Sequence, residues 1–175
     1  MKYPPYIPNA ALQVNDGNAL SDWFGAQNPT GDLLDVNVWF ALADPEHKHH
    51  KPALAYWSAI QATKTPVWFC RVTMLGMVRL LAQQAAMGER RLSLQDAHAV
   101  YESYLQLPFV HWFPETNSLA KKVDAKLASI VQGLPVRMST DAYLGAMALS
   151  TGLRMVTFDA DFKRFELENW LLLSA

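Results

Sequence analysis

The chain reads LLDVN at residues 33–37, where a short apolar run ends in an aspartate, Asp35. A second apolar run, in VTFDAD at residues 156–161, leads to Asp159. Such short runs predict buried strands, and an unpaired carboxylate at a buried strand end is unfavourable. A third aspartate, Asp141, opens a helical stretch after a Ser-Thr pair, where a carboxylate is favourable. Because strands of an open parallel sheet converge on one crevice at their carboxyl ends, we expect these three carboxylates to share a divalent cation there.

Strand-like and helix-like segments alternate along the chain from residue 33 onward. Helical periodicity and capping residues predict helices at 51–63, 72–84, 118–132 and 141–151, and another capped by Ser93. Strands are expected at 33–36 or on to 39, and at 67–70, 109–112, 154–158 and 170–173. This alternation predicts an α/β fold in which helices cover both faces of a mostly parallel sheet. In an extended segment Asp35 and Asn37 would face the same side, since side chains alternate along a strand.

Length and composition limit the class of protein. The chain has 175 residues, half of them apolar, and a net charge of −1, which predicts a globular protein without a strong basic field for nucleic acid. A single cysteine, Cys70, excludes an internal disulfide or a thiolate zinc cluster. No apolar run is long enough to span a bilayer, so we expect a cytoplasmic protein without membrane contact. Residues 1–31 are Pro-rich at their start and read as a partly ordered N-terminal arm, followed by one domain at 32–175.

Five segments, in this order, carry a resemblance to a known family. The chain resembles PIN-domain ribonucleases of the VapC toxin type at LLDVNV (33–38), DPEHKHH (44–50), TMLGMVRL (73–80), TDAYLGAMA (140–148) and VTFDADF (156–162). The resemblance implies a PIN-like three-layer α/β/α fold and metal-dependent hydrolysis of RNA phosphodiester bonds. It also implies the role of the toxin in a toxin–antitoxin pair, with a cognate antitoxin protein as partner and a homodimer as assembly.

The same resemblance assigns roles to individual residues. The acidic cluster that holds the metal and carries catalysis corresponds to Asp35, Asp141 and Asp159. Asn37 matches the residue that supports the first acid, Thr157 matches a hydroxyl that organises the site, and Asp161 matches a secondary acid. Hard carboxylate oxygens suit Mg²⁺, or Mn²⁺, better than Zn²⁺.

The sequence departs from the family pattern in the helix at 72–84. Many members place a glutamate three residues after the position of Thr73, whereas this chain has Gly76 there. Thr73, Gly76 and Arg79 share one helix face by their spacing, so we expect this face to line the site, with room at Gly76 for a glutamate or a water. Arg79 is then a candidate for binding a phosphate bidentately, or for pairing with one of the acids.

Two other functions remain open on the sequence alone. The glycine at position 76 is compatible with a catalytically weak or inactive PIN domain that serves as a protein-binding module. A phosphotransfer protein on the same sheet would use Asp35 as a nucleophile. Phosphatases of that kind normally carry a second aspartate where this chain has Asn37, and a lysine after a later strand that this chain lacks before Asp159.

Overall fold

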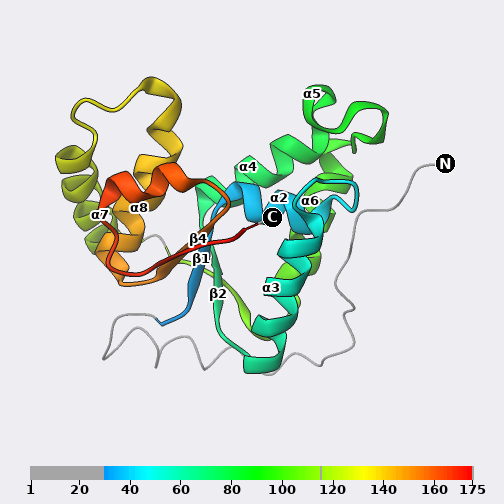
Figure 1. Ribbon diagram of the computed structural model, residues 1–175, viewed down its shortest axis with the longest axis horizontal. Helices are drawn as coiled ribbons and strands as arrows, with labels where there is room; N and C mark the ends of the chain where they lie inside the picture. Colours follow the sequence, from blue (N-terminus) through cyan, green and yellow to red (C-terminus); the bar gives the residue numbers. More distant parts are fainter. Residues whose placement is uncertain (1–29, 115, 175) are drawn as a thin grey trace.

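A five-stranded parallel sheet forms the centre of the protein (Figure 1). The computed structural model describes residues 30–114 and 116–174. The strand order is β3-β2-β1-β4-β5, and every neighbouring pair is parallel. The strands are β1 (Asp32–Leu34), β2 (Val67–Phe69), β3 (Val110–Trp112), β4 (Arg154–Thr157) and β5 (Trp170–Leu172). The predicted α/β fold with a parallel sheet is confirmed.

Helices cover both faces of this sheet and complete the three layers (Figure 1). One layer holds α2 (Val36–Ala43), α3 (His50–Thr63), α4 (Arg71–Ala82) and α6 (Leu94–Leu105). The other holds α7 (Asn117–Ile130), α8 (Ser139–Thr151) and the 3₁₀ helix η3 (Ala160–Phe165). Three short elements connect them: α5 (Gln84–Met87), η1 (Gly88–Arg90) and η2 (Val136–Met138). In residues 30–114 and 116–174 we find no helix with the length and apolar character that a membrane span requires.

Alternating side chains of the central strands divide the core into two apolar clusters. Leu34 and Val156 belong to the cluster under α2, α3, α4 and α6, whereas Leu33 and Met155 belong to the cluster under α7 and α8. Successive residues of a strand point to opposite faces, and both faces of a sheet of parallel strands are buried. Leu33 and Leu34, and likewise Met155 and Val156, are therefore apolar at successive positions because each side chain lies under one of the two helical layers.

Most predicted element ends agree with the structure, and one difference affects the site. Ser93 caps α6 by accepting the backbone N–H of Asp96 at 3.0 Å, and Gly152 ends α8 with φ 77°. The first strand, however, ends at Leu34, and α2 begins at Val36 after an extended Asp35. A strand from 33 to 36 or 39 was wrong, because the chain turns into a helix directly after Asp35. The expected N-terminal arm lies outside the described residues, apart from positions 30 and 31.

The topology reverses direction between β1 and β4. From β1 the chain proceeds outward through β2 to β3, and it later returns to place β4 and β5 on the other side of β1. In parallel sheets such a reversal opens a crevice at the carboxyl ends of the two strands concerned. Asp35 follows β1 and Asp159 follows β4, so both aspartates lie at this crevice.

Candidate active site

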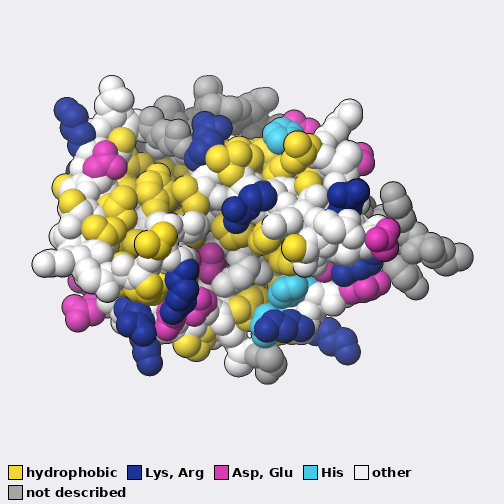
Figure 2. Space-filling model, turned by 90° about the horizontal axis from the view of Figure 1, so that it is seen from above, with side chains coloured by type: hydrophobic (Ala, Val, Ile, Leu, Met, Phe, Trp, Pro, Cys, Tyr) yellow, Lys and Arg dark blue, Asp and Glu magenta, His cyan; other side chains and the backbone are white. Residues whose placement is uncertain are grey.

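A cleft of about 520 Å³ lies at the carboxyl edge of the sheet and brings the three predicted aspartates to its walls. Figure 2 looks onto this edge and shows acidic side chains in the middle of the face, with basic and apolar side chains around them. The first wall comes from α2 and α4, and it consists of Asp35, Val36, Asn37, Phe40, Val72, Leu75, Gly76, Arg79 and Leu80. The second comes from η2, α8 and the residue after β4, namely Arg137, Thr140, Asp141 and Asp159.

Asp35 lines the cleft and is held there by two neighbouring side chains. Only 5 % of it is exposed. Its Oδ2 accepts a hydrogen bond from Nδ2 of Asn37 at 2.6 Å and another from the Thr157 hydroxyl at 2.7 Å. Asn37 also accepts the backbone N–H of Phe158 at 3.2 Å, so its amide is fixed in turn. Asn37 and Thr157 therefore fix the orientation of the Asp35 carboxyl.

The expected neighbourhood of Asp35 and Asn37 exists, but the reason given for it was wrong. Asn37 is the second residue of α2, not the third residue of a strand. A tight turn from the end of β1 into the first turn of α2 brings its amide back to Asp35, whereas strand alternation has no part in the contact.

Burial and neighbouring charges set the ionisation of the acids. Burial raises the pKa of Asp35 to about 7. The hydrogen bond from Thr157 lowers this pKa, and the negative charges of Asp141 and Asp159 raise it. Burial also raises the pKa of Asp141. The negative charge of Asp159 raises this pKa further, and the positive charge of Arg137 lowers it. These are the effects expected when like charges share a poorly hydrated cleft. A cation that entered the cleft would favour the ionised form of both groups.

The three carboxylates share the cleft without closing around one point. Within residues 30–114 and 116–174, no three Asp, Glu, His or Cys side chains are gathered closely enough to hold one ion together. Binding of one cation by all three acids therefore stays a prediction, since in the described residues the carboxylates line one cleft without meeting at one point. Asp159 is turned toward its own 3₁₀ helix, where its Oδ1 accepts the N–H of Asp161 at 2.8 Å, and Asp141 stands on α8, in the opposite layer from α4.

The arrangement still fits a hydrated hard cation. Mg²⁺ commonly keeps several waters and takes only one or two carboxylates from the protein, with phosphate oxygens completing its shell. Asp35, Asp141 and Asp159 lie on facing walls of one cleft, so one or two of their carboxylates could bind such a cation directly and the others through its waters.

Comparison with known proteins identifies the family. The family model of the PIN domain matches residues 33–167. The chain belongs to the PIN domain family. Relatives from Mycobacterium tuberculosis include Ribonuclease VapC41, which is 31% identical over 137 residues, covering 76% of this chain and 92% of the relative. Ribonuclease VapC37 is 28% identical over 140 residues, covering 79% and 94%.

Solved structures support the same fold. VapBC2 from Rickettsia felis, in a crystal structure bound to a fragment of promoter DNA, matches with a TM-score of 0.59 at 11% identity, covering 82% of this chain and 98% of that one. FitAB bound to a DNA fragment matches with a TM-score of 0.56 at 19% identity, covering 81% and 94%. At these identities the likeness establishes the PIN fold and nothing about what this chain binds.

Two residues of α4 differ from what the sequence predicted, Thr73 in its position and Gly76 in the space beside it. Thr73 is fully buried and caps α4, because its Oγ1 accepts the N–H of Cys70 and donates to the Cys70 carbonyl, both at 3.0 Å. It does not line the cleft. Gly76 does line the cleft, but a Cβ there would lie 2.6 Å from Cγ2 of Val36. The expected room for a glutamate or a water is therefore taken up by Val36.

Two arginines, Arg79 and Arg137, also belong to the cleft lining, and Asp161 pairs with one of them. Arg79 lines the cleft as expected. Asp161 does not, and its carboxylate instead accepts hydrogen bonds from Arg137 at 3.3 Å and Arg164 at 3.4 Å. Desolvation acts to raise the pKa of Asp161, but these two arginines outweigh it and lower that pKa. Sequence reasoning missed Arg137, whose place just before the helix of Asp141 was the available signal.

Proposed function

We propose that this PIN domain is a ribonuclease that hydrolyses RNA phosphodiester bonds with a divalent cation held by Asp35, Asp141 and Asp159. One observation carries the proposal: three aspartates from three separate elements line one cleft, and the most buried of them has a pKa raised to about 7. Perturbed carboxylates gathered in a cleft are typical of catalytic sites. The relatives named ribonucleases support this reading.

The residues of the cleft have distinct parts in the proposed reaction. Mg²⁺, or Mn²⁺, would polarise the phosphoryl oxygen, orient the attacking water and stabilise the leaving oxygen. Asp35 would hold the cation in its ionised form, and the bonds from Asn37 and Thr157 keep its carboxylate in one orientation. Asp141 and Asp159 supply negative charge from the second wall. Asp161 acts at one remove, since its backbone N–H positions the Asp159 carboxylate.

We further propose that the protein is the toxin of a toxin–antitoxin pair, acts as a homodimer in the cytoplasm and binds a cognate antitoxin protein. Relatives named Ribonuclease VapC support this role. The catalytic domain would comprise residues 32–175, with 1–31 as an N-terminal arm, and the match of the PIN family model to 33–167 supports that division.

RNA cleavage by the purified full chain tests the proposal. A labelled single-stranded RNA should be cut in Mg²⁺ or Mn²⁺ and should stay intact in EDTA, and the Asp141→Asn variant should lose at least about a hundredfold in rate. Expression without a partner should arrest growth for the wild type but not for this variant. A folded wild type that leaves RNA intact in either metal would support the binding-module alternative. Metal-dependent hydrolysis of a simple phosphate monoester instead of RNA would support phosphotransfer.

A further inference from the structure

Arg137 stands on the wall of the cleft opposite Arg79. It belongs to η2, directly before α8, whereas Arg79 belongs to α4 in the other helical layer. Figure 1 shows these layers on the two sides of the sheet, with β1 and β4 between them. An extended strand that crosses the cleft over the three aspartates would therefore meet a guanidinium on each side.

Arg137 is held in place by a weak bond that can be exchanged. Its Nη2 lies 3.3 Å from Oδ2 of Asp161, and the two side chains are 67 % and 30 % exposed. Ion pairs at such exposed positions contribute little. Asp161 also has a second partner, because Nε of Arg164 lies 3.4 Å from its Oδ1. Arg137 can therefore leave Asp161 without leaving that carboxylate unpaired.

The two arginines decide the sign of the charge in the cleft. Three ionised aspartates carry three negative charges, and a divalent cation would cancel two of them. The remaining negative charge would still repel RNA, but Arg79 and Arg137, the basic side chains that line the cleft, turn the total positive. Guanidinium groups also match the geometry of phosphate oxygens and bind them bidentately.

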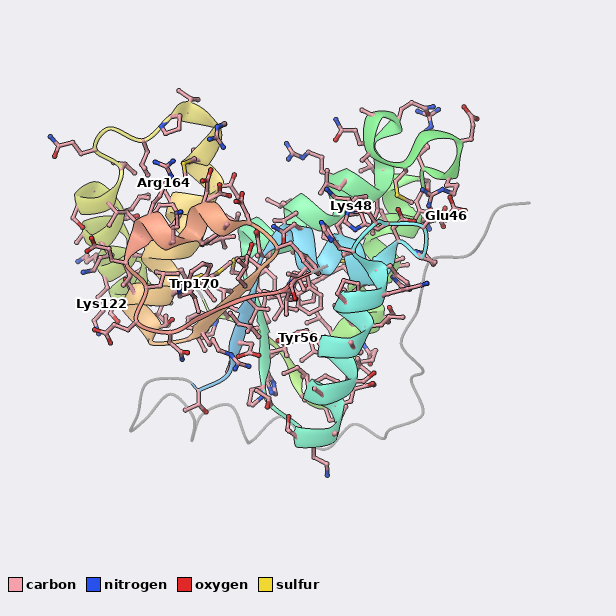
Figure 3. The ribbon with its side chains drawn as sticks, viewed as in Figure 1. Glu46, Lys48, Tyr56, Lys122, Arg164 and Trp170 are labelled. Atoms are coloured by element: carbon pink, nitrogen blue, oxygen red, sulfur yellow. The ribbon has the colours of Figure 1, made fainter. Side chains whose placement is uncertain are left out.

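We propose that Arg137 is a substrate-positioning residue, paired with Asp161 in the free protein, that transfers to an RNA phosphate beside the scissile bond, across the cleft from Arg79. This inference rests on the proposed ribonuclease function and adds a residue to it. Arg164 has no such part, because it pairs with the same aspartate but does not line the cleft. In Figure 3 its side chain lies on the side of the molecule formed by α7 and α8.

Steady-state cleavage kinetics give the first test. Arg137→Ala should raise KM for a single-stranded RNA about tenfold, the equivalent of about 1.4 kcal/mol, and should leave kcat within about threefold. Arg137→Lys should recover part of the loss, since it keeps the charge and loses the planar fork. Arg164→Ala, the matched control on the same aspartate, should behave as the wild type.

The salt dependence of RNA binding gives a second test that does not require turnover. In an Asp35→Asn background, the slope of log K against log salt should become shallower by about 0.7 for Arg137→Ala, the value for one lost phosphate contact on a single strand. Arg164→Ala should keep the original slope. Asp161→Asn should keep the slope and bind RNA as tightly as its parent or more tightly, because it frees Arg137. Weaker binding by Asp161→Asn would refute the exchange.

The outcomes separate this inference from the proposed function. A wild type that cleaves RNA, with unchanged KM and salt slope in Arg137→Ala, would overturn the role of Arg137 and leave the ribonuclease standing. A wild type that neither cleaves nor binds RNA would remove both. Equal losses in Arg137→Ala and Arg164→Ala would show a general effect of surface charge and would also overturn the role of Arg137.

Discussion

At the scale of single residues, folding and chemistry make opposed demands on Asp35. Its carboxyl is buried between the ends of β1 and β4, where burial favours the neutral form and raises its pKa to about 7. Hydrogen bonds from Asn37 and Thr157 partly compensate, as charge-assisted bonds to a buried carboxylate should. The position of Asp35 after an apolar run was readable from the sequence. Its bond to Asn37 was expected for the wrong reason, because the local chain is helical there.

The Asp35→Asn variant should be more stable than the wild type in metal-free buffer at alkaline pH. The raised pKa means that the folded protein keeps its proton after the unfolded chain has lost it, so wild-type stability falls as pH rises from about 4 to about 7. Asparagine removes this loss and should raise the free energy of unfolding by roughly 1–3 kcal/mol at about pH 8. Urea unfolding in EDTA at about pH 4 and pH 8 measures it.

The pH dependence supplies the control for this variant. The stabilisation should shrink toward zero near pH 4, where the carboxyl is protonated in both states, and saturating Mg²⁺ should reduce or reverse it at pH 8. An Asp35→Asn protein that is less stable than the wild type at pH 8 in EDTA would mean that the carboxylate is needed structurally.

At the scale of elements, the contact between α4 and α2 positions one wall of the cleft. Gly76 lets the backbone of α4 approach the side chain of Val36, the first residue of α2 and the neighbour of Asp35. Thr73 and Cys70 fix the start of the same helix through their capping bonds. In this chain the Thr73 and Gly76 positions therefore serve the placement of α4, and Arg79 one turn later reaches the cleft.

Replacing Gly76 should disturb this contact. In Gly76→Ala the new Cβ would meet Val36 Cγ2 at 2.6 Å, and the stiff branched side chain has little freedom to move away. Overpacking should lower the free energy of unfolding by about 1–3 kcal/mol, and RNA cleavage should fall because Val36 adjoins Asp35. Chemical unfolding and the cleavage assay measure the two effects.

A compensating substitution distinguishes overpacking from other causes. Val36→Ala removes the two atoms nearest the added Cβ, so the double variant with Gly76→Ala should be more stable than the sum of the two single effects allows. Strict additivity would show that Val36 is not the obstacle. Gly76→Glu must place a larger group at the same point, so it should lower the free energy of unfolding more than Gly76→Ala does. It should not tighten Mn²⁺ binding.

At the scale of the whole molecule, a buried polar cluster joins the layers at the edge of the sheet opposite the cleft. Asp32 on β1 accepts two hydrogen bonds from Arg154 on β4, at 2.8 and 2.7 Å, and one from the Tyr56 hydroxyl on α3 at 2.6 Å. Burial and the charge of Asp32 raise the pKa of Tyr56, which keeps its hydroxyl protonated as a donor. The cluster fixes β1 beside β4, the strand pair whose far ends form the cleft.

Arg154→Met should therefore destabilise the whole fold. It leaves the carboxylate of Asp32, which is 1 % exposed, without its cationic partner, and breaking a buried pair in this way costs about 3–5 kcal/mol. Since part of the Arg154 side chain is exposed, we expect the lower end of that range, measured by thermal and urea unfolding. Asp32→Asn in the same background should restore part of the loss. A variant with wild-type stability would show that the cluster contributes nothing.

By itself, the sequence determined the parallel α/β fold, most helix and strand positions, and the three aspartates of the proposed site. These follow from local patterns, since apolar runs, helical spacing and capping residues depend on neighbours within a few positions. Only the tertiary structure decided which polar side chains meet. Asn37 reaches Asp35 through the turn into α2, Gly76 is filled by Val36, Thr73 is a buried cap, and Arg137 lies across the cleft from Arg79. The Thr157 hydroxyl bonds Asp35 across 122 positions of the chain. Contacts of this kind, like those of Gly76 with Val36, depend on how the helices and strands pack together, which no local pattern encodes.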